Sequence, residues 1–234
     1  MTAGTTSADS QYRSQRWFRD TAIAGRAVSI RDEFLPAEPC QKYMLWIDGV
    51  GGWLLCSGPE FVIGAPSFEK RSADIALLAN VSRRHATLKH TGTEWRLQAL
   101  QPTSVSGKQI TDSHAMRSGD QICLAERVCL GFRTPSVLSS SAVIDFESDH
   151  RPSHSVDGII LMTDHCLLGP RRDHHIHCSQ WPDLVVLFEQ QGQLRCRAKM
   201  PISVDGRPVR DSAELTDGSL VSGEELRFRV ERVQ

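Results

Sequence analysis

The stretch MLWIDGVGGWLLC, residues 44–56, has the pattern of two β-strands joined by a tight turn. Apolar residues occupy both ends of the stretch, and Asp48-Gly49 lies between them. Asp-Gly is favoured in hairpin turns because these turns need positive φ angles, which glycine adopts without steric cost. We therefore predict that a β-hairpin opens the folded part of the chain.

The sequence after this hairpin consists of short apolar runs separated by turn residues, which is typical of consecutive β-strands. Apolar and polar residues alternate over residues 95–99 and again over residues 128–132. Apolar spacing of the helical type is nearly absent. The predicted fold class is all-β.

The second half of the chain echoes the first. Three glycine-containing motifs recur in the same order, 105, 99 and 99 residues later. The paired segments are 61–64 with 166–169, 105–110 with 204–209, and 117–119 with 216–218. The closing apolar strands match as well, so the pattern indicates an internal duplication.

A small, polar segment, TPSVLSSS at residues 134–141, has the composition of a linker between the two copies. We predict tandem β-sandwiches at residues 43–134 and 142–231. A polar N-terminal tail, residues 1–42, precedes them, with a short helix expected around residues 10–23.

The first copy carries six short motifs in a fixed order. They are Ile63-Gly64, Asp74-Ile75, Val81-Ser82-Arg83-Arg84-His85-Ala86, Trp95-Arg96-Leu97, Val105-Ser106-Gly107 and Gly119-Asp120-Gln121-Ile122. This order resembles the forkhead-associated (FHA) domain over about residues 43–132. The resemblance implies a β-sandwich whose loops at one end bind phosphothreonine peptides. The second copy is similar to the same family only in its frame, because it has no Ser-Arg-x-His string.

A phosphate bound by a protein of nearly neutral charge needs local donors that converge on its oxygens. Ser82, Arg83 and Arg84 lie in a predicted turn between two strands, where such donors can converge. By the resemblance, Ser82 would donate its hydroxyl and Arg83 would supply charge. His85 would face inward and hold the loop by a hydrogen bond. Gly64 and Gly107 are further structural positions of the loops.

Two features of the family's site are missing. The family usually has an Arg directly after the glycine of the first motif, whereas this chain has Ala65 and then Pro66. The family's Asn-containing loop corresponds to residues 100–104, which lack Asn. A charge-assisted hydrogen bond contributes roughly 1.5–3 kcal/mol, so we expect a weakened phosphopeptide site. A scaffold that binds partners independently of phosphorylation is the alternative.

The run His174-His175-Ile176-His177-Cys178 contains a second group of candidate ligands. In a strand, His175 and His177 would share one face and form half of a tetrahedral metal site. The matching stretch of the first copy, residues 72–76, is a plain strand entry. We therefore favour exposed histidines beside an inward Ile176, with a metal-dependent enzyme built on His175 and His177 as a further alternative.

Composition narrows the partners and the compartment. Lys and Arg number 27 and Asp and Glu 28, so no basic field exists to hold a nucleic acid. No apolar run approaches the roughly 18 residues of a membrane span, and no signal peptide is evident, so we expect a cytoplasmic protein without a membrane partner. Seven cysteines without a Cys-x-x-Cys pair indicate reduced thiols, with Cys123 and Cys129 as packing residues.

No catalytic motif is present. A Ser82 nucleophile activated by His85 is disfavoured, because neither an acid partner nor a Gly-x-Ser-x-Gly elbow occurs. We predict a non-catalytic protein–protein interaction module of the kind used in signalling. It needs no cofactor, and its partner is a protein or a phosphothreonine-containing peptide.

Overall fold

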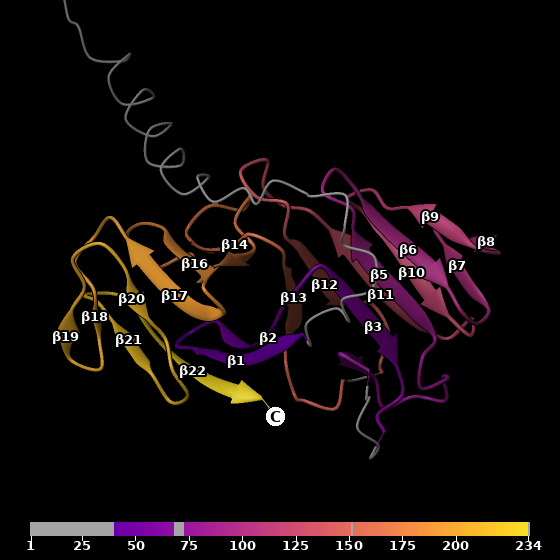
Figure 1. Cartoon of the computed structure of the whole chain (residues 1–234), viewed down its shortest axis with the longest axis horizontal. Coiled ribbons are helices and arrows are strands. Elements are labelled where there is room, and N and C mark those ends of the chain that lie inside the picture. Colours follow the sequence, from indigo (N-terminus) through magenta and orange to yellow (C-terminus); the bar gives the residue numbers. More distant parts are fainter. Residues whose placement is uncertain (1–39, 68–72, 151, 234) are drawn as a thin grey trace, which may run out of the picture. The chain divides into compact units, whose positions relative to one another are not determined.

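The computed structural model describes residues 40–67, 73–150 and 152–233. These residues form twenty-two β-strands in three sheets, and no helix occurs among them (Figure 1). The predicted all-β fold class is therefore confirmed. The predicted tail, with its helix around residues 10–23, lies outside the described residues apart from residues 40–42. A helix long and apolar enough to cross a membrane is not found in the described part.

The largest sheet takes strands from both halves of the chain. The first half supplies β1 (Gln41–Ile47), β2 (Gly51–Ser57), β7 (Thr103–Val105), β8 (Lys108–Ile110), β10 (Asp120–Leu124) and β11 (Val128–Arg133). The second half supplies β12 (Ala142–Phe146), β13 (Gly158–Met162), β18 (Ser203–Val204), β19 (Arg207–Pro208), β21 (Leu220–Ser222) and β22 (Arg227–Val233). The order across this twelve-stranded sheet is β19-β18-β21-β22-β1-β2-β13-β12-β11-β10-β7-β8.

Two five-stranded sheets complete the fold. The N-terminal sheet contains β3 (Glu60–Gly64), β4 (Ile75–Ala76), β5 (Ala86–His90), β6 (Trp95–Ala99) and β9 (Ser113–Ala115) in the order β4-β3-β5-β6-β9. The C-terminal sheet contains β14 (His165–Gly169), β15 (Ile176–His177), β16 (Val185–Gln190), β17 (Gln193–Ala198) and β20 (Ala213–Glu214) in the order β15-β14-β16-β17-β20. The two orders correspond strand for strand, which supports the predicted duplication.

The hairpin predicted at residues 44–56 is confirmed. β1 and β2 pair antiparallel, with Ile47 opposite Gly51. Gly49 has a φ of 72°, and the Val50 N–H donates to the Ile47 carbonyl at 3.1 Å. A residue with a Cβ atom adopts this φ only at a cost, so the glycine of Asp48-Gly49 suits the turn.

This hairpin pairs with strands of the second half. β1 lies antiparallel to β22, and β2 lies parallel to β13. β11, the last strand before the linker, pairs with β12. The sheet of each half is thus extended by the first two strands of the other half. Main-chain hydrogen bonds therefore join the two predicted sandwiches directly.

Four strands in the middle of the large sheet, β1, β2, β13 and β12, have buried side chains on both faces, although Trp46 of β1 is 41% exposed. Alternate side chains enter two separate hydrophobic cores. The N-terminal core receives Met44, Leu54, Ile144 and Ile159, and the C-terminal core receives Leu45, Leu55, Val143 and Ile160. Burial on both faces explains why these segments are continuous apolar runs and not alternating ones.

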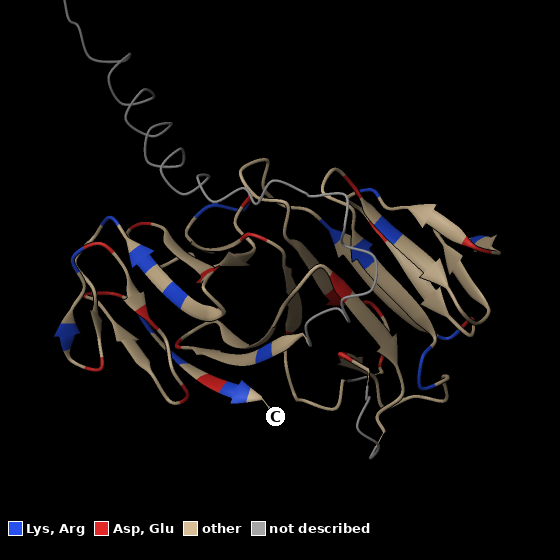
Figure 2. Cartoon of the chain, viewed as in Figure 1, with Lys and Arg blue, Asp and Glu red and all other residues tan. Residues whose placement is uncertain are grey.

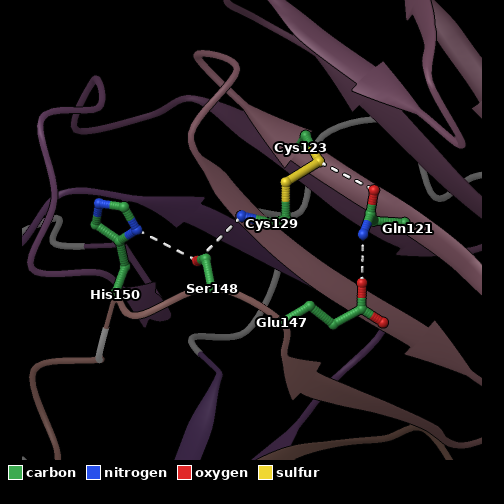
Figure 3. Close-up of a disulfide and its surroundings, with 6 residues drawn as sticks. All are labelled: Gln121, Cys123, Cys129, Glu147, Ser148 and His150. Carbon is green, nitrogen blue, oxygen red and sulfur yellow. Dashed lines mark hydrogen bonds between the residues drawn. A yellow bond between two sulfur atoms is a disulfide. The ribbon is translucent and has the colours of Figure 1, made fainter.

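Cys123 and Cys129 form a disulfide, so the expectation of reduced packing residues is wrong for this pair (Figure 3). They are directly opposite each other on the antiparallel strands β10 and β11, with their Cα atoms 4.2 Å apart. Side chains of opposite residues are close neighbours on one face of a sheet. The other five cysteines are free: Cys40, Cys56, Cys166, Cys178 and Cys196.

His175 links the start of β12 to the C-terminal sheet. Its side chain is fully buried. The Leu167 N–H donates to Nδ1 at 3.0 Å, and Nε2 donates to the Ser141 carbonyl at 3.2 Å. Burial, the largest effect, lowers the pKa of His175 to about 4. The imidazole is therefore neutral at pH 7.

The exchange of strands predicts that neither half folds alone. Residues 40–134 in isolation would lack β12, and Leu45 and Leu55 would lose the C-terminal core. We expect this fragment to show no cooperative thermal transition by circular dichroism. Co-expression with residues 135–234 should restore one complex with the melting curve of the full chain. A cooperative transition of the isolated fragment would contradict the prediction.

His175 predicts a loss of stability in mild acid. Its pKa of about 4 in the folded protein lies below its ordinary value of 6.5, so unfolding takes up a proton between these values. This contribution is complete above pH 6.5 and falls by up to about 3 kcal/mol as the pH drops towards 4.

His175→Gln should therefore flatten the dependence of the unfolding free energy on pH between 6.5 and 4, measured by urea titration. His177→Gln is the matched control, because His177 is exposed. His90, His154 and His174, whose pKa values burial also lowers, contribute to the slope in all three proteins alike. Equal slopes for wild type and His175→Gln would refute the assignment.

Candidate functional site

The Ser82-Arg83-Arg84 segment lies between β4 and β5, and all three residues are exposed. The segment is bound to the end of β3, because the Ala65 N–H donates to the Ser82 carbonyl at 3.0 Å. Lys and Arg are interspersed with Asp and Glu over the described strands and loops (Figure 2). The two arginines therefore provide a local positive charge on a protein with little net charge.

Gly64 allows the loop to lie directly on β3. A Cβ atom at Gly64 would be 2.2 Å from the Arg83 carbonyl oxygen and 2.6 Å from that of Ser82. Such distances are far inside van der Waals contact. Glycine is thus required here by the close approach of another backbone, and not by an unusual φ angle.

His85 is 2% exposed and ties the loop to its neighbours through both ring nitrogens. The Ser82 N–H donates to Nδ1 at 3.3 Å, and Nε2 donates to the Pro102 carbonyl at 3.0 Å. In this arrangement Nδ1 accepts a hydrogen bond and Nε2 donates one. The inward His85 connects the Ser82 turn with the segment before β7.

The backbone of His85 extends this connection. Its N–H donates to the Ile63 carbonyl at 2.8 Å, and its carbonyl accepts from the N–H groups of Leu100 and Gln101 at 3.0 Å each. Three chain segments therefore meet at one residue: the end of β3, the Ser82 turn and the loop before β7. A hydrogen-bonded junction of this kind fixes the backbone of an exposed loop.

The same contacts leave His85 without the geometry of a general base for Ser82. Its Nδ1 faces the Ser82 backbone N–H, and its Nε2 is bound to the Pro102 carbonyl. A base that activates a hydroxyl needs a free ring nitrogen within reach of that oxygen. The pair is arranged to shape a loop.

Gly107 belongs to another turn, between β7 and β8. Ser106 has a φ of 47° and Gly107 a φ of 79°, the two positive values of a type I′ turn. The Ser106 hydroxyl donates to Asp120 Oδ1 at 3.0 Å and its N–H to the Gln121 carbonyl at 2.8 Å. In the second half, Asp205 and Gly206 repeat this turn with φ values of 51° and 76°.

The second half has different side chains where the first half has its exposed donors. Val62 pairs with Thr87, and in the second half Leu167 pairs with Val186. Counting back from Thr87 and Val186, the residues at the positions of 82–85 are Trp181-Pro182-Asp183-Leu184. The Trp181 ring is buried and stacks on Phe228 with centroids 5.9 Å apart. A buried tryptophan, a proline and an aspartate thus stand where the first half has Ser82, Arg83 and Arg84.

Arg171 and Arg172, which follow Gly169 and Pro170, do not provide the missing donors of this turn. Arg171 is exposed and forms a two-pronged ion pair with Asp173, at 2.8 Å for both nitrogens. Its charge is therefore already balanced within the loop. Arg172 is also exposed.

The histidine run does not bring metal ligands together. His175 is buried and bound to backbone groups, whereas His177 is exposed, with its Nε2 at 3.1 Å from the Pro170 carbonyl. The predicted common face of His175 and His177 is wrong, because β15 begins only at Ile176. His174 is buried as well, so the expectation of exposed histidines fails for two of three. The described residues contain no cluster of three or more His, Cys, Asp or Glu side chains able to hold a metal ion.

Comparison with known proteins supports the resemblance found in the first half of the sequence. Residues 61–125 match the family model described as the FHA domain. None of the curated proteins matches the chain. Among solved structures, "Mycobacterium tuberculosis EmbR in complex with low affinity phosphopeptide" is 27% identical over 36% of this chain and 22% of that chain, with a TM-score of 0.28.

Two further structures are similar to this chain. "Structural and functional analysis of phosphothreonine-dependent FHA domain interactions" has 23% identity, covers 36% of this chain and 88% of that chain, and has a TM-score of 0.28. "N-terminal FHA domain from EssC a component of the bacterial Type VII secretion apparatus" has 13% identity, covers 82% of this chain and 95% of that chain, and has a TM-score of 0.23. The match at residues 61–125 confirms that the first copy is related to the forkhead-associated domain family.

Proposed function

We propose that the first half of this chain binds phosphothreonine-containing peptides through the Ser82–Arg84 loop, as a non-catalytic protein-interaction module. FHA domains are phosphopeptide-binding interaction modules, and the family model matches residues 61–125. The observation that carries the proposal is the His85 junction, which holds an exposed hydroxyl and two exposed guanidinium groups on one rigid turn. Donors fixed before binding lose less entropy when a phosphate arrives.

Each side chain has a distinct role in this proposal. The Ser82 hydroxyl donates to a phosphate oxygen, and Arg83 supplies a charge-assisted hydrogen bond. Arg84 adds positive charge beside them. Ala65 leaves the position next to Gly64 without a charged donor, so the site binds phosphate more weakly than one with an arginine there. Gly64, His85 and Gly107 shape the loops.

The test is a titration of a phosphothreonine peptide library against its unphosphorylated twin, followed by isothermal calorimetry of the selected peptide. Arg83→Ala should weaken binding by about tenfold, the effect of about 1.4 kcal/mol. The loss should shrink in high salt, because exposed ionic contacts are screened. Ser82→Ala should have a smaller and less salt-dependent effect, because its donor is neutral.

His85→Ala serves as the structural comparison. It removes two hydrogen bonds and leaves a cavity, so we expect about 3 kcal/mol lower stability, whereas Ser82→Ala and Arg83→Ala should melt like the wild type. Equal binding of phosphorylated and unphosphorylated peptides would replace this proposal by a phosphorylation-independent scaffold.

A gain-of-function variant tests the missing donor. Ala65→Arg places a guanidinium next to Gly64, and we expect phosphopeptide affinity to rise about tenfold or more. Ala65→Gln is the control, because it adds a side chain without the charge. Pro66 restricts residue 65 to extended conformations and limits where the new side chain points. If Ala65→Arg has no effect and Arg83→Ala has none either, the loops do not converge on a phosphate.

A further inference from the structure

The Cys123–Cys129 disulfide lies on the outer face of the β10–β11 pair, with both residues half-buried. Polar groups of the chain after β12 lie along this face (Figure 3). The Cys129 N–H donates to Ser148 Oγ at 3.2 Å, and Gln121 Nε2 donates to Glu147 Oε2 at 2.7 Å. The disulfide is thus partly exposed, so that a small thiol can approach it.

The free cysteines have a different environment. Cys56, Cys166, Cys178 and Cys196 are fully buried. Burial raises the pKa of Cys178 and Cys196 to about 12, so their thiols carry almost no reactive thiolate at pH 7. Thiol chemistry of the described residues therefore concentrates at the Cys123–Cys129 pair and at the half-buried Cys40.

The turn beyond the disulfide resists closure of the hairpin. Ala125 has a φ of 47° and Glu126 a φ of 64°, both in the left-handed region and both without glycine. Each such residue costs roughly 1 kcal/mol or more. A covalent bond between Cys123 and Cys129 keeps the two strands together directly below this turn.

The same turn is hydrogen-bonded to the loop before β7, which also binds His85 of the candidate site. The Ala125 N–H donates to the Pro102 carbonyl at 3.2 Å, and His85 Nε2 donates to that same carbonyl at 3.0 Å. His85 Nδ1 in turn accepts the Ser82 N–H. The strand pair adds a second connection, since Leu124 lies opposite Thr103, the residue after Pro102. Ala125, two residues after Cys123, is therefore connected to Ser82 through three hydrogen bonds.

We propose that the Cys123–Cys129 disulfide is a redox modification site, reduced by a dithiol, that controls the order of the Ser82–Arg84 loop. The link to peptide affinity rests on the proposed function. A thiolate of the reductant attacks one sulfur and forms a mixed disulfide, and its second thiolate then displaces the other cysteine. The reductant leaves as a disulfide, and the protein gains two electrons and two protons as two thiols. The strained turn then opens, Pro102 loses the Ala125 donor, and the His85 junction loosens.

The first measurement asks whether the native protein is reduced at this pair. Dithiothreitol followed by iodoacetamide should add two alkyl groups, at Cys123 and Cys129, relative to the untreated folded protein. Cys166 and Cys196 should stay unmodified. If these two cysteines become reactive only in denaturant, the proposal is wrong.

The second measurement is amide hydrogen exchange of residues 82–85 and 100–103 in oxidised and reduced full-length protein. We expect roughly tenfold faster exchange in both segments after reduction. Cys123→Ser with Cys129→Ser should show the fast rate with or without dithiothreitol. Residues 185–190, in the cysteine-free strand β16, should exchange alike in all forms. Unchanged exchange at 82–85 in fully reduced protein would overturn the proposal.

A third variant tests the route through the turn. Ala125→Asn with Glu126→Gly provides the residues that a type I′ turn favours, so the hairpin should remain closed without the disulfide. Its reduced form should keep slow exchange at residues 82–85. Fast exchange in this reduced variant would show that the coupling does not pass through the turn, contrary to the proposal.

Peptide binding separates this proposal from the proposed function. If exchange accelerates on reduction and phosphopeptide affinity falls, both hold. If exchange accelerates and no phosphopeptide binds in either state, the redox coupling stands and the proposed function fails. If phosphopeptide binds equally in both states with unchanged exchange, the redox coupling fails and the proposed function stands.

Discussion

The burial of β1, β2, β12 and β13 on both faces is the constraint on which the rest of the structure depends. Each of these strands supplies side chains to both the N-terminal and the C-terminal core. The parallel contact of β2 with β13 joins the antiparallel pair β1–β2 to the antiparallel pair β12–β13. Asp157 stabilises the start of this contact, because its Oδ2 accepts the Gly52 N–H at 2.9 Å and its N–H donates to the Gly52 carbonyl at 2.7 Å. A polar side chain at one of these buried positions would enter a core, so the buried positions of the four strands are occupied mainly by apolar residues.

The sequence predicts the strands but not their partners. Residues 44–56 form the expected hairpin because apolar runs around Asp48-Gly49 have few other conformations. Nothing in that pattern distinguishes β22 from β11 as the neighbour of β1, since a duplicated chain offers two similar edges. The disulfide, in contrast, is predictable from the sequence pattern. The alternation of residues 122–124 and 128–132 places position 123 opposite 129 once the hairpin is closed at Leu124 and Val128.

At the candidate site, the sequence motif predicts which residues lie in the loop. The close contacts between backbone segments are visible only in the structure. Gly64 is needed because the carbonyl groups of residues 82 and 83 pass over it, which no motif spacing shows. His175 was misread for a related reason. In the first half, Asp74 accepts the Val62 N–H at 2.8 Å. Leu167 holds the same place in the second half that Val62 holds in the first, and His175 accepts its N–H at 3.0 Å. The Asp74 carboxylate and the His175 imidazole thus serve the same purpose, which is to accept a backbone N–H. Residue type alone indicates a metal ligand at His175, whereas the fold uses it as a hydrogen-bond acceptor.

The two halves stabilise the turn before β5 and before β16 by different interactions. In the first half the buried His85 imidazole fixes the turn from inside, and the outward side chains of Ser82, Arg83 and Arg84 are polar. In the second half Trp181 fills the core from the corresponding turn, and the turn is stabilised by apolar burial. This turn, residues 181–184, contains neither a hydroxyl nor a guanidinium group. The second half instead supplies β12 and β13 to the sheet on which the first half's loops are mounted, and so supports the candidate site structurally.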